Sequence, residues 1–169
     1  MTLGGLAQWL VLAVALQRLG ELALARRNTK KLLAAGGLES GAGHYWLIVG
    51  LHGGWLAAIF ATIPPDAAVN WWLASTFALL QIGRIWVLAS LGQYWTTRII
   101  TVPGAPLVRR GPYRWIRHPN YLIVAGEIAL LPLAFGAWRI ALGFSVANMA
   151  LIAWRIRIED RTLDSRRTA

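Results

Sequence analysis

The sequence GPYRWIRHPNY, at Gly111–Tyr121, interrupts two long apolar runs with prolines, arginines and aromatic residues. Glycine and proline disfavour a continuous helix here, because proline lacks an amide hydrogen and clashes with the preceding turn. Pro119 suits the first position of a new helix, so that the helix would begin directly after His118. The stretch therefore predicts a folded loop that ends where an apolar helix begins.

Five apolar stretches lie around this loop, each close to the roughly 20 residues that a helix needs to cross hydrocarbon. They cover residues 2–25, 44–63, 70–91, 120–135 and 138–154, and the fourth is the shortest. The composition agrees, since 57% of the residues are hydrophobic and ten are tryptophan. We predict an all-α polytopic integral membrane protein that forms a single domain over residues 1–169.

The charge is strongly positive, with 17 Lys and Arg against 7 Asp and Glu. In a soluble protein this excess would suggest nucleic acid, but here the basic residues lie between apolar segments, where topology and anionic lipid explain them. They concentrate in residues 26–31, 98–117 and 155–167. The positive-inside rule places these segments in the cytoplasm, with the N-terminus outside and the C-terminus inside. Residues 92–119 then form a cytoplasmic loop and 155–169 a cytoplasmic end.

The residue inventory excludes some chemistry. The chain has no cysteine, so disulfides and thiolate catalysis are excluded, and its three histidines and seven acids show no metal-ligand spacing. We expect no metal and no nucleic-acid partner; membrane lipids are the expected surroundings.

Two polar groups could carry chemistry. A helix that begins at Pro119 would point backbone N–H groups at the loop beside Arg114 and Arg117, which makes either an anion site or an anchor for lipid phosphate. Arg155 and Glu159 share one face of the last helix, either as a polar wall facing the loop or as a surface ion pair.

Charged residues also occur within the predicted spans. Arg18 and Glu21 fit a pair within the first helix, and Arg84 and Glu127 fit a pair between the third and fourth. Charges at this depth are unfavourable unless they face a cavity or one another. A structural role is favoured for both pairs, and contact of Arg84 and Glu127 with a substrate stays open.

The loop motif, followed by a helical hairpin and then RIRIEDRTL at Arg155–Leu163, resembles the isoprenylcysteine carboxyl methyltransferase family. The upstream pattern around Glu21, Asn28, Glu39 and His52 resembles the short bacterial branch of that family. Some members of that branch methylate polyketide lipids such as alkylpyrones and alkylresorcinols.

The resemblance implies an S-adenosylmethionine-dependent methyltransferase of the bacterial inner membrane whose active site faces the cytoplasm. The loop and the C-terminal helix would close the cofactor pocket. By position in the family motifs, Arg155 and Glu159 would act at the reacting end. The residues expected to bind the cofactor are Tyr113, Arg117, His118, Pro119, Tyr121 and Glu159.

The resemblance also implies a hydrophobic acceptor, either a prenylated substrate or another lipophilic small molecule. The Phe-Gly and Tyr-rich tail of many family members has no counterpart in residues 161–169. The resemblance still implies methyl transfer to an oxygen. A carboxylate and a hydroxyl acceptor both stay open, as does the oligomeric state. Two alternatives are a membrane reductase that uses a nicotinamide cofactor and a non-enzymatic lipid-binding protein.

Overall fold

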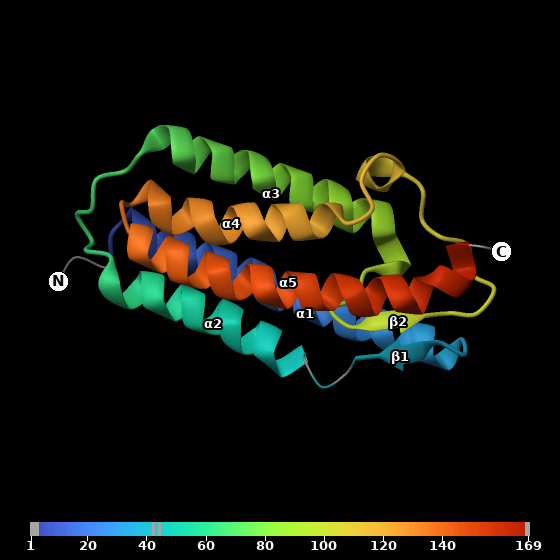
Figure 1. Ribbon diagram of the computed structural model, residues 1–169. Helices are drawn as coiled ribbons and strands as arrows, with labels where there is room; N and C mark the ends of the chain where they lie inside the picture. Colours follow the sequence, from blue (N-terminus) through green and yellow to red (C-terminus); the bar gives the residue numbers. More distant parts are fainter. Residues whose placement is uncertain (1–3, 42, 44, 168–169) are drawn as a thin grey trace.

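The computed structural model describes the backbone of residues 4–41, 43 and 45–167. The predicted starts of the first two spans, at residues 2 and 44, and the final residues 168–169 lie outside the described residues. Within that part of the chain, five α-helices run lengthwise in a bundle (Figure 1): α1 Leu6–Ala34, α2 Tyr45–Thr62, α3 Trp71–Leu91, α4 Pro119–Ala134 and α5 Trp138–Arg167. The chain is thus an all-α membrane protein. Helices α1 and α5 continue beyond the predicted span ends at residues 25 and 154.

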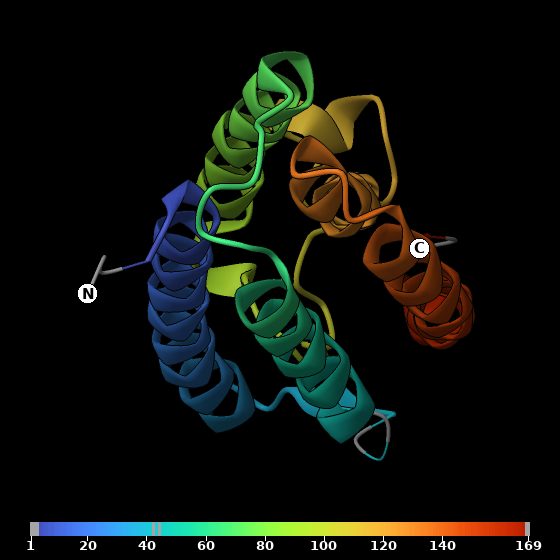
Figure 2. The same cartoon turned by 90° about the vertical axis from the view of Figure 1, so that its left-hand side faces the viewer.

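The lengths of the helices divide them into two groups. Among the described residues, four helices, α1, α2, α3 and α5, are long and apolar enough to cross a membrane. Helix α4 has 16 residues, which gives a length of about 24 Å against a hydrocarbon core of about 30 Å. It is also largely covered by protein, because it packs between α3 and α5. Figure 2, which looks along the bundle, shows this position.

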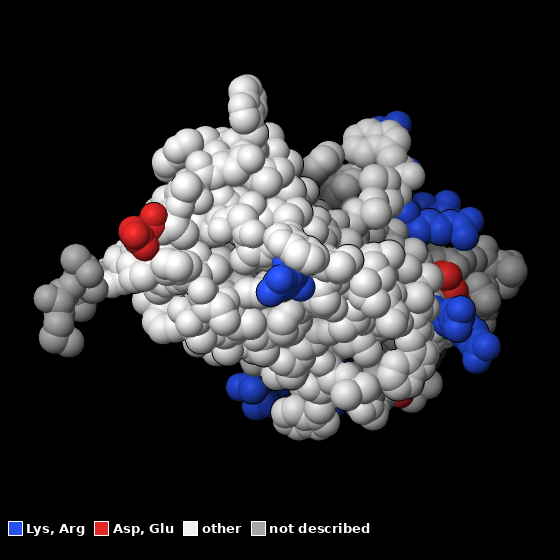
Figure 3. Space-filling model, turned by 60° about the vertical axis from the view of Figure 1, so that its left-hand side comes forward, with Lys and Arg blue, Asp and Glu red and all other residues white. Residues whose placement is uncertain are grey.

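The outer surface suits lipid. Large apolar side chains point outward along the helices, including Leu16 at 69% exposed and Trp72 at 87%. The face shown in Figure 3 carries few charged side chains over its long middle part. In water such a surface would aggregate, whereas in a bilayer it needs no protein partner.

A proline in α4 explains one contact in the core. Pro132 has no amide hydrogen, so the carbonyl of Ile128, four residues earlier, lacks its usual helical donor. The indole Nε1 of Trp55, a fully buried residue of α2, donates to this carbonyl oxygen at 3.2 Å. Trp55 thereby satisfies a polar group that no water can reach and ties α2 to α4.

Replacing Trp55 with Phe should therefore lower the free energy of unfolding by about 1–3 kcal/mol, because the Ile128 carbonyl loses its donor. Chemical unfolding of micelle-embedded protein measures this. Trp72→Phe, at an exposed position, is the control and should change little; equal stability of the two variants would contradict the role of Trp55.

The connections at one end of the bundle form a compact layer. Residues 92–118 contain short 3-10 helices at Gly92–Tyr94 and Gly111–Arg114 and the strand β2 Ile99–Thr101. This strand pairs antiparallel with β1 Leu38–Ser40, so that Glu39 lies opposite Ile100. The sheet was not expected from the sequence, because three-residue strands are too short to show a periodic pattern. We call this end of the molecule the loop end.

Side chains from α1 and β1 fix this layer to the helices. The buried amide of Asn28 in α1 donates to the carbonyl oxygens of Gly92 and Trp95, at 3.0 and 2.9 Å. Arg98 pairs with Glu39 across the sheet, with Nη1 2.9 Å from both carboxylate oxygens. The loop after α3 is therefore held in one conformation over the end of the bundle.

Candidate functional site

A cavity of about 880 Å³ lies inside the bundle and reaches the loop end. All five helices and the loop contribute to its wall, from Arg18 in α1 and His52 in α2 to Arg155 in α5. Its wall is mostly apolar, and its polar groups lie at two levels, which are described in turn.

The polar groups nearest the loop end meet at the hydroxyl of Tyr121, in the first turn of α4. Arg155 Nε donates to this hydroxyl at 2.8 Å, and the hydroxyl donates to Glu159 Oε2 at 2.5 Å. Arg155 also donates through Nη2 to the backbone carbonyl of Thr97 in the loop, at 2.8 Å. Arg155 and Glu159 thus share one face of α5, as expected, and are linked through Tyr121.

His118 forms the edge of the same group. It is the residue before the first turn of α4, and its ring stacks on Tyr121 with ring centres 5.4 Å apart. Its Nδ1 lies 3.8 Å from Glu159 Oε2, and its Nε2 lies 3.3 Å from Asp160 Oδ1. The His-Pro-x-Tyr motif and the Glu-Asp pair, far apart in the sequence, therefore meet across the α4–α5 interface.

The loop supplies two further walls. Tyr113, in the 3-10 helix Gly111–Arg114, and Arg117 both line the cavity. Burial, together with the negative charge of Glu159, raises the pKa of the Tyr113 hydroxyl above its ordinary value. Tyr113 therefore stays a hydrogen-bond donor over the physiological pH range.

Six of the residues predicted from the sequence line this one cavity: Tyr113, Arg117, His118, Tyr121, Arg155 and Glu159. Pro119 does not, since it is buried at the first position of α4, where it sets the direction of the helix. Sequence reasoning missed Thr97, which acts through its backbone carbonyl and leaves no side-chain signal. It also missed Asn120, which lines the cavity from within the motif itself.

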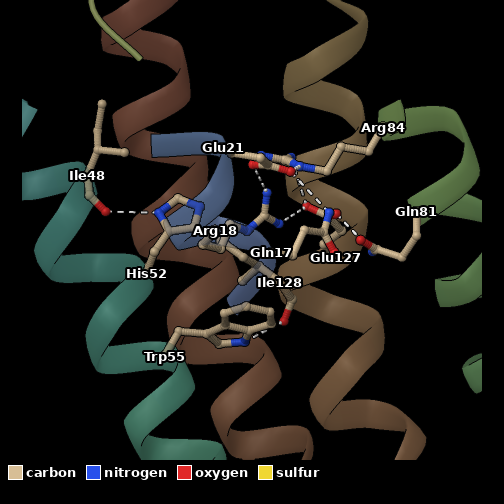
Figure 4. Close-up of polar contacts among 10 residues, drawn as sticks. All are labelled: Gln17, Arg18, Glu21, Ile48, His52, Trp55, Gln81, Arg84, Glu127 and Ile128. Atoms are coloured by element: carbon tan, nitrogen blue, oxygen red, sulfur yellow. Dashed lines mark hydrogen bonds and ion pairs between the residues drawn. The ribbon is translucent and has the colours of Figure 1, made fainter. Parts of the chain in front are cut away.

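The second level, deeper in the bundle, is a network of four charged side chains (Figure 4). The two predicted pairs are confirmed: Arg18 lies 3.1 Å from Glu21, and Arg84 lies 3.3 Å from Glu127. The structure also joins them, with Arg18–Glu127 and Arg84–Glu21 distances of 2.5 Å each. Gln17 donates to Glu21 Oε1, which also accepts from Arg84 Nε, and Gln81 donates to Glu127 Oε1. The charges cancel, and α1, α3 and α4 are linked where apolar contact alone would leave a gap.

Removing one member should destabilise the fold more than removing a balanced pair. Glu127→Leu leaves Arg18 and Arg84 facing the single carboxylate of Glu21, and we expect a loss of about 3–5 kcal/mol in the free energy of unfolding. Adding Arg18→Met restores the balance and should recover part of that loss. Unfolding of micelle-embedded protein gives both values, and a double variant no more stable than Glu127→Leu alone would contradict this account.

Comparison with known proteins identifies the family of the chain. Residues 72–165, from α3 to the last turn of α5, match the isoprenylcysteine carboxyl methyltransferase (ICMT) family. The chain belongs to this family. It is also 41% identical over 160 residues to the uncharacterized protein YpbQ of Bacillus subtilis, an alignment that covers 92% of this chain and 95% of that protein. No solved structure matches the chain.

Membership of the ICMT family makes the chain a membrane methyltransferase. His118, Arg155 and Glu159 surround Tyr121, and we call these four residues the Tyr121 group. The matched region contains all of them, as well as Arg84 and Glu127 from the charged network. Arg18, Glu21 and His52 lie outside it, on α1 and α2. The relation to YpbQ extends over most of the chain, so the two N-terminal helices are part of what these two proteins share.

Proposed function

We propose that this protein transfers the methyl group of S-adenosylmethionine to an oxygen atom of a hydrophobic acceptor at the cytoplasmic face of the membrane. The observation that carries the proposal is the cavity of about 880 Å³, which joins the polar group around Tyr121 to apolar walls within the bundle. A water-soluble cofactor and a lipid acceptor can meet only in a space of this kind.

The polar end suits the cofactor. S-adenosylmethionine carries a sulfonium, an ammonium and a carboxylate, and when bound it supplies an electrophilic methyl group. The Glu159 carboxylate and the ring face of Tyr113 favour a cation, while Arg117 beside the first turn of α4 favours a carboxylate. Asn120 Oδ1, buried in the cavity wall without a hydrogen-bond partner among the described residues, offers an acceptor for an ammonium or a hydroxyl.

The apolar walls suit the acceptor. Val124, Leu151 and Ile152 line the cavity next to the Tyr121 group, and Leu56 and Val49 line it from α2. Val49 is 40% exposed on α2, so this wall continues to the membrane side of the bundle. A lipid would enter laterally, with its oxygen toward the loop end and its chain among the helices.

The contribution of the protein is mainly positioning. Displacement at a sulfonium methyl carbon requires the nucleophile, the carbon and the sulfur to lie in line and water to be excluded. Arg155, fixed by the Thr97 carbonyl and the Tyr121 hydroxyl, would orient an anionic oxygen by a charge-assisted hydrogen bond. Glu159 would accept the proton if the acceptor is a hydroxyl.

Calorimetric titration of nanodisc-embedded protein with S-adenosylhomocysteine tests the cofactor site. We expect saturable binding that His118→Ala and Glu159→Ala each weaken at least about tenfold, or about 1.4 kcal/mol. Asp66→Ala is the matched control, because it removes an exposed carboxylate at the opposite end of the bundle, and it should bind like the unmodified protein.

Folded protein that binds no S-adenosylhomocysteine would contradict the proposal. Binding of NADPH instead would favour the reductase alternative, and binding of neither S-adenosylhomocysteine nor NADPH would favour a non-enzymatic lipid-binding protein. Thermal unfolding of each variant separates loss of binding from loss of structure.

The proposed orientation, with the loop end in the cytoplasm, is also testable. Because the chain has no cysteine, one introduced cysteine is a unique label site. In intact cells a membrane-impermeant maleimide should label Asp66→Cys but should label Lys30→Cys only after permeabilisation. Both positions are exposed: Asp66 lies in the connection between α2 and α3, and Lys30 lies near the end of α1 at the loop end. The reverse labelling pattern would invert the topology.

A further inference from the structure

The cavity does not end at the Tyr121 group but continues to a second polar level. Glu127 follows Tyr121 by six residues in α4, and Asn148 precedes Arg155 by seven in the antiparallel α5. A helix rises 1.5 Å per residue, so Glu127 and Asn148 each lie about 10 Å deeper in the bundle than Tyr121 and Arg155. Because Tyr121 and Arg155 are hydrogen-bonded to each other, Glu127 and Asn148 lie at about the same depth. Between the two levels the wall is apolar, with Val124, Leu151 and Ile152.

Asn148 is an unpaired polar group at this deeper level. It lines the cavity and is only 3% exposed, and its Nδ2 has no hydrogen-bond partner in the described part of the chain. An amide shut away from water without a partner is unfavourable, and the cost is removed when a ligand supplies the missing hydrogen bond. A turn about the last side-chain bond exchanges the amide oxygen and nitrogen, so Asn148 can meet either a donor or an acceptor.

The facing walls at this level are polar but carry no net charge. Arg18, Glu21 and Arg84 line the cavity, and with Glu127 they neutralise one another. His52 of α2 also lines it; its Nδ1 is bonded to the Ile48 carbonyl oxygen at 2.9 Å, which leaves Nε2 for another partner. A neutral hydrogen-bonding group fits this environment, whereas an added charge would disturb the balanced network.

We propose that Asn148 and His52 form a second substrate subsite, an inference that rests on the proposed function. The subsite takes a neutral polar group, such as a hydroxyl, a ketone or an amide, within the acceptor, about 10 Å from the oxygen that is methylated. The acceptor class is thus a lipid with a second polar group along its chain. Asn148 is a specificity-determining residue, because a plain alkyl chain would leave its amide buried and unpaired.

The test compares long-chain carboxylic acids of one length, one plain and the others with a hydroxyl at successive positions along the chain. Dissociation constants are measured by native mass spectrometry on protein saturated with S-adenosylhomocysteine. We expect one mid-chain position to bind at least about tenfold more tightly than the plain acid. Asn148→Leu, similar in size, should abolish this preference while it still binds the plain acid.

Ser145→Ala is the control, because Ser145 is another unpaired buried group on α5, one turn away from Asn148 and not in the cavity wall. It should keep the preference. If Asn148→Leu fails to fold, Asn148→Ala serves the same comparison. A hydroxyl preference that survives these changes, no preference at any position, or binding of no acid by folded protein would each overturn the subsite. Saturation with S-adenosylhomocysteine is scored separately, so a failure of the cofactor site is recognised on its own.

Discussion

Charged side chains buried among helices in a membrane must be paired, and this constraint shapes the bundle. Arg18 and Glu21 of α1 meet Arg84 of α3 and Glu127 of α4 in one neutral network. In hydrocarbon, apolar side chains give helices little reason to prefer one neighbour over another, since lipid tails are equally apolar. The network supplies that preference for α1, α3 and α4.

The same rule operates at the backbone. Pro132 frees the Ile128 carbonyl, and Trp55 supplies a donor for it. Asn28 does the same for two carbonyls of the loop that follows α3. These two irregular segments are thus tied to side chains from other helices, which is a condition under which irregular backbone is tolerated near a membrane. The loop fixed in this way contains Thr97, whose carbonyl oxygen accepts a hydrogen bond from Arg155.

The Tyr121 group and the charged network both line the cavity. At the loop end, α4 and α5 bring the tyrosine of one motif between the arginine and the glutamate of another. Deeper in, the neutral network forms part of the wall rather than lying apart from it. Under the proposed function, the polar end of the cavity holds the cofactor and the apolar interior holds the lipid acceptor.

The sequence by itself determined the helical class, the Arg18–Glu21 pair and the family, because apolar runs, i,i+3 spacing and the motifs at 111–121 and 155–163 are local patterns. The pairing of Arg84 with Glu127 followed from the cost of leaving either charge alone within a membrane span. The tertiary structure alone decided that the two pairs form one network, that Tyr121 links Arg155 to Glu159, and that strands at 38–40 and 99–101 pair. It alone also placed Asn148 and His52 on one cavity. These contacts join residues far apart in the chain, and their energy depends on distances that only the packed helices fix.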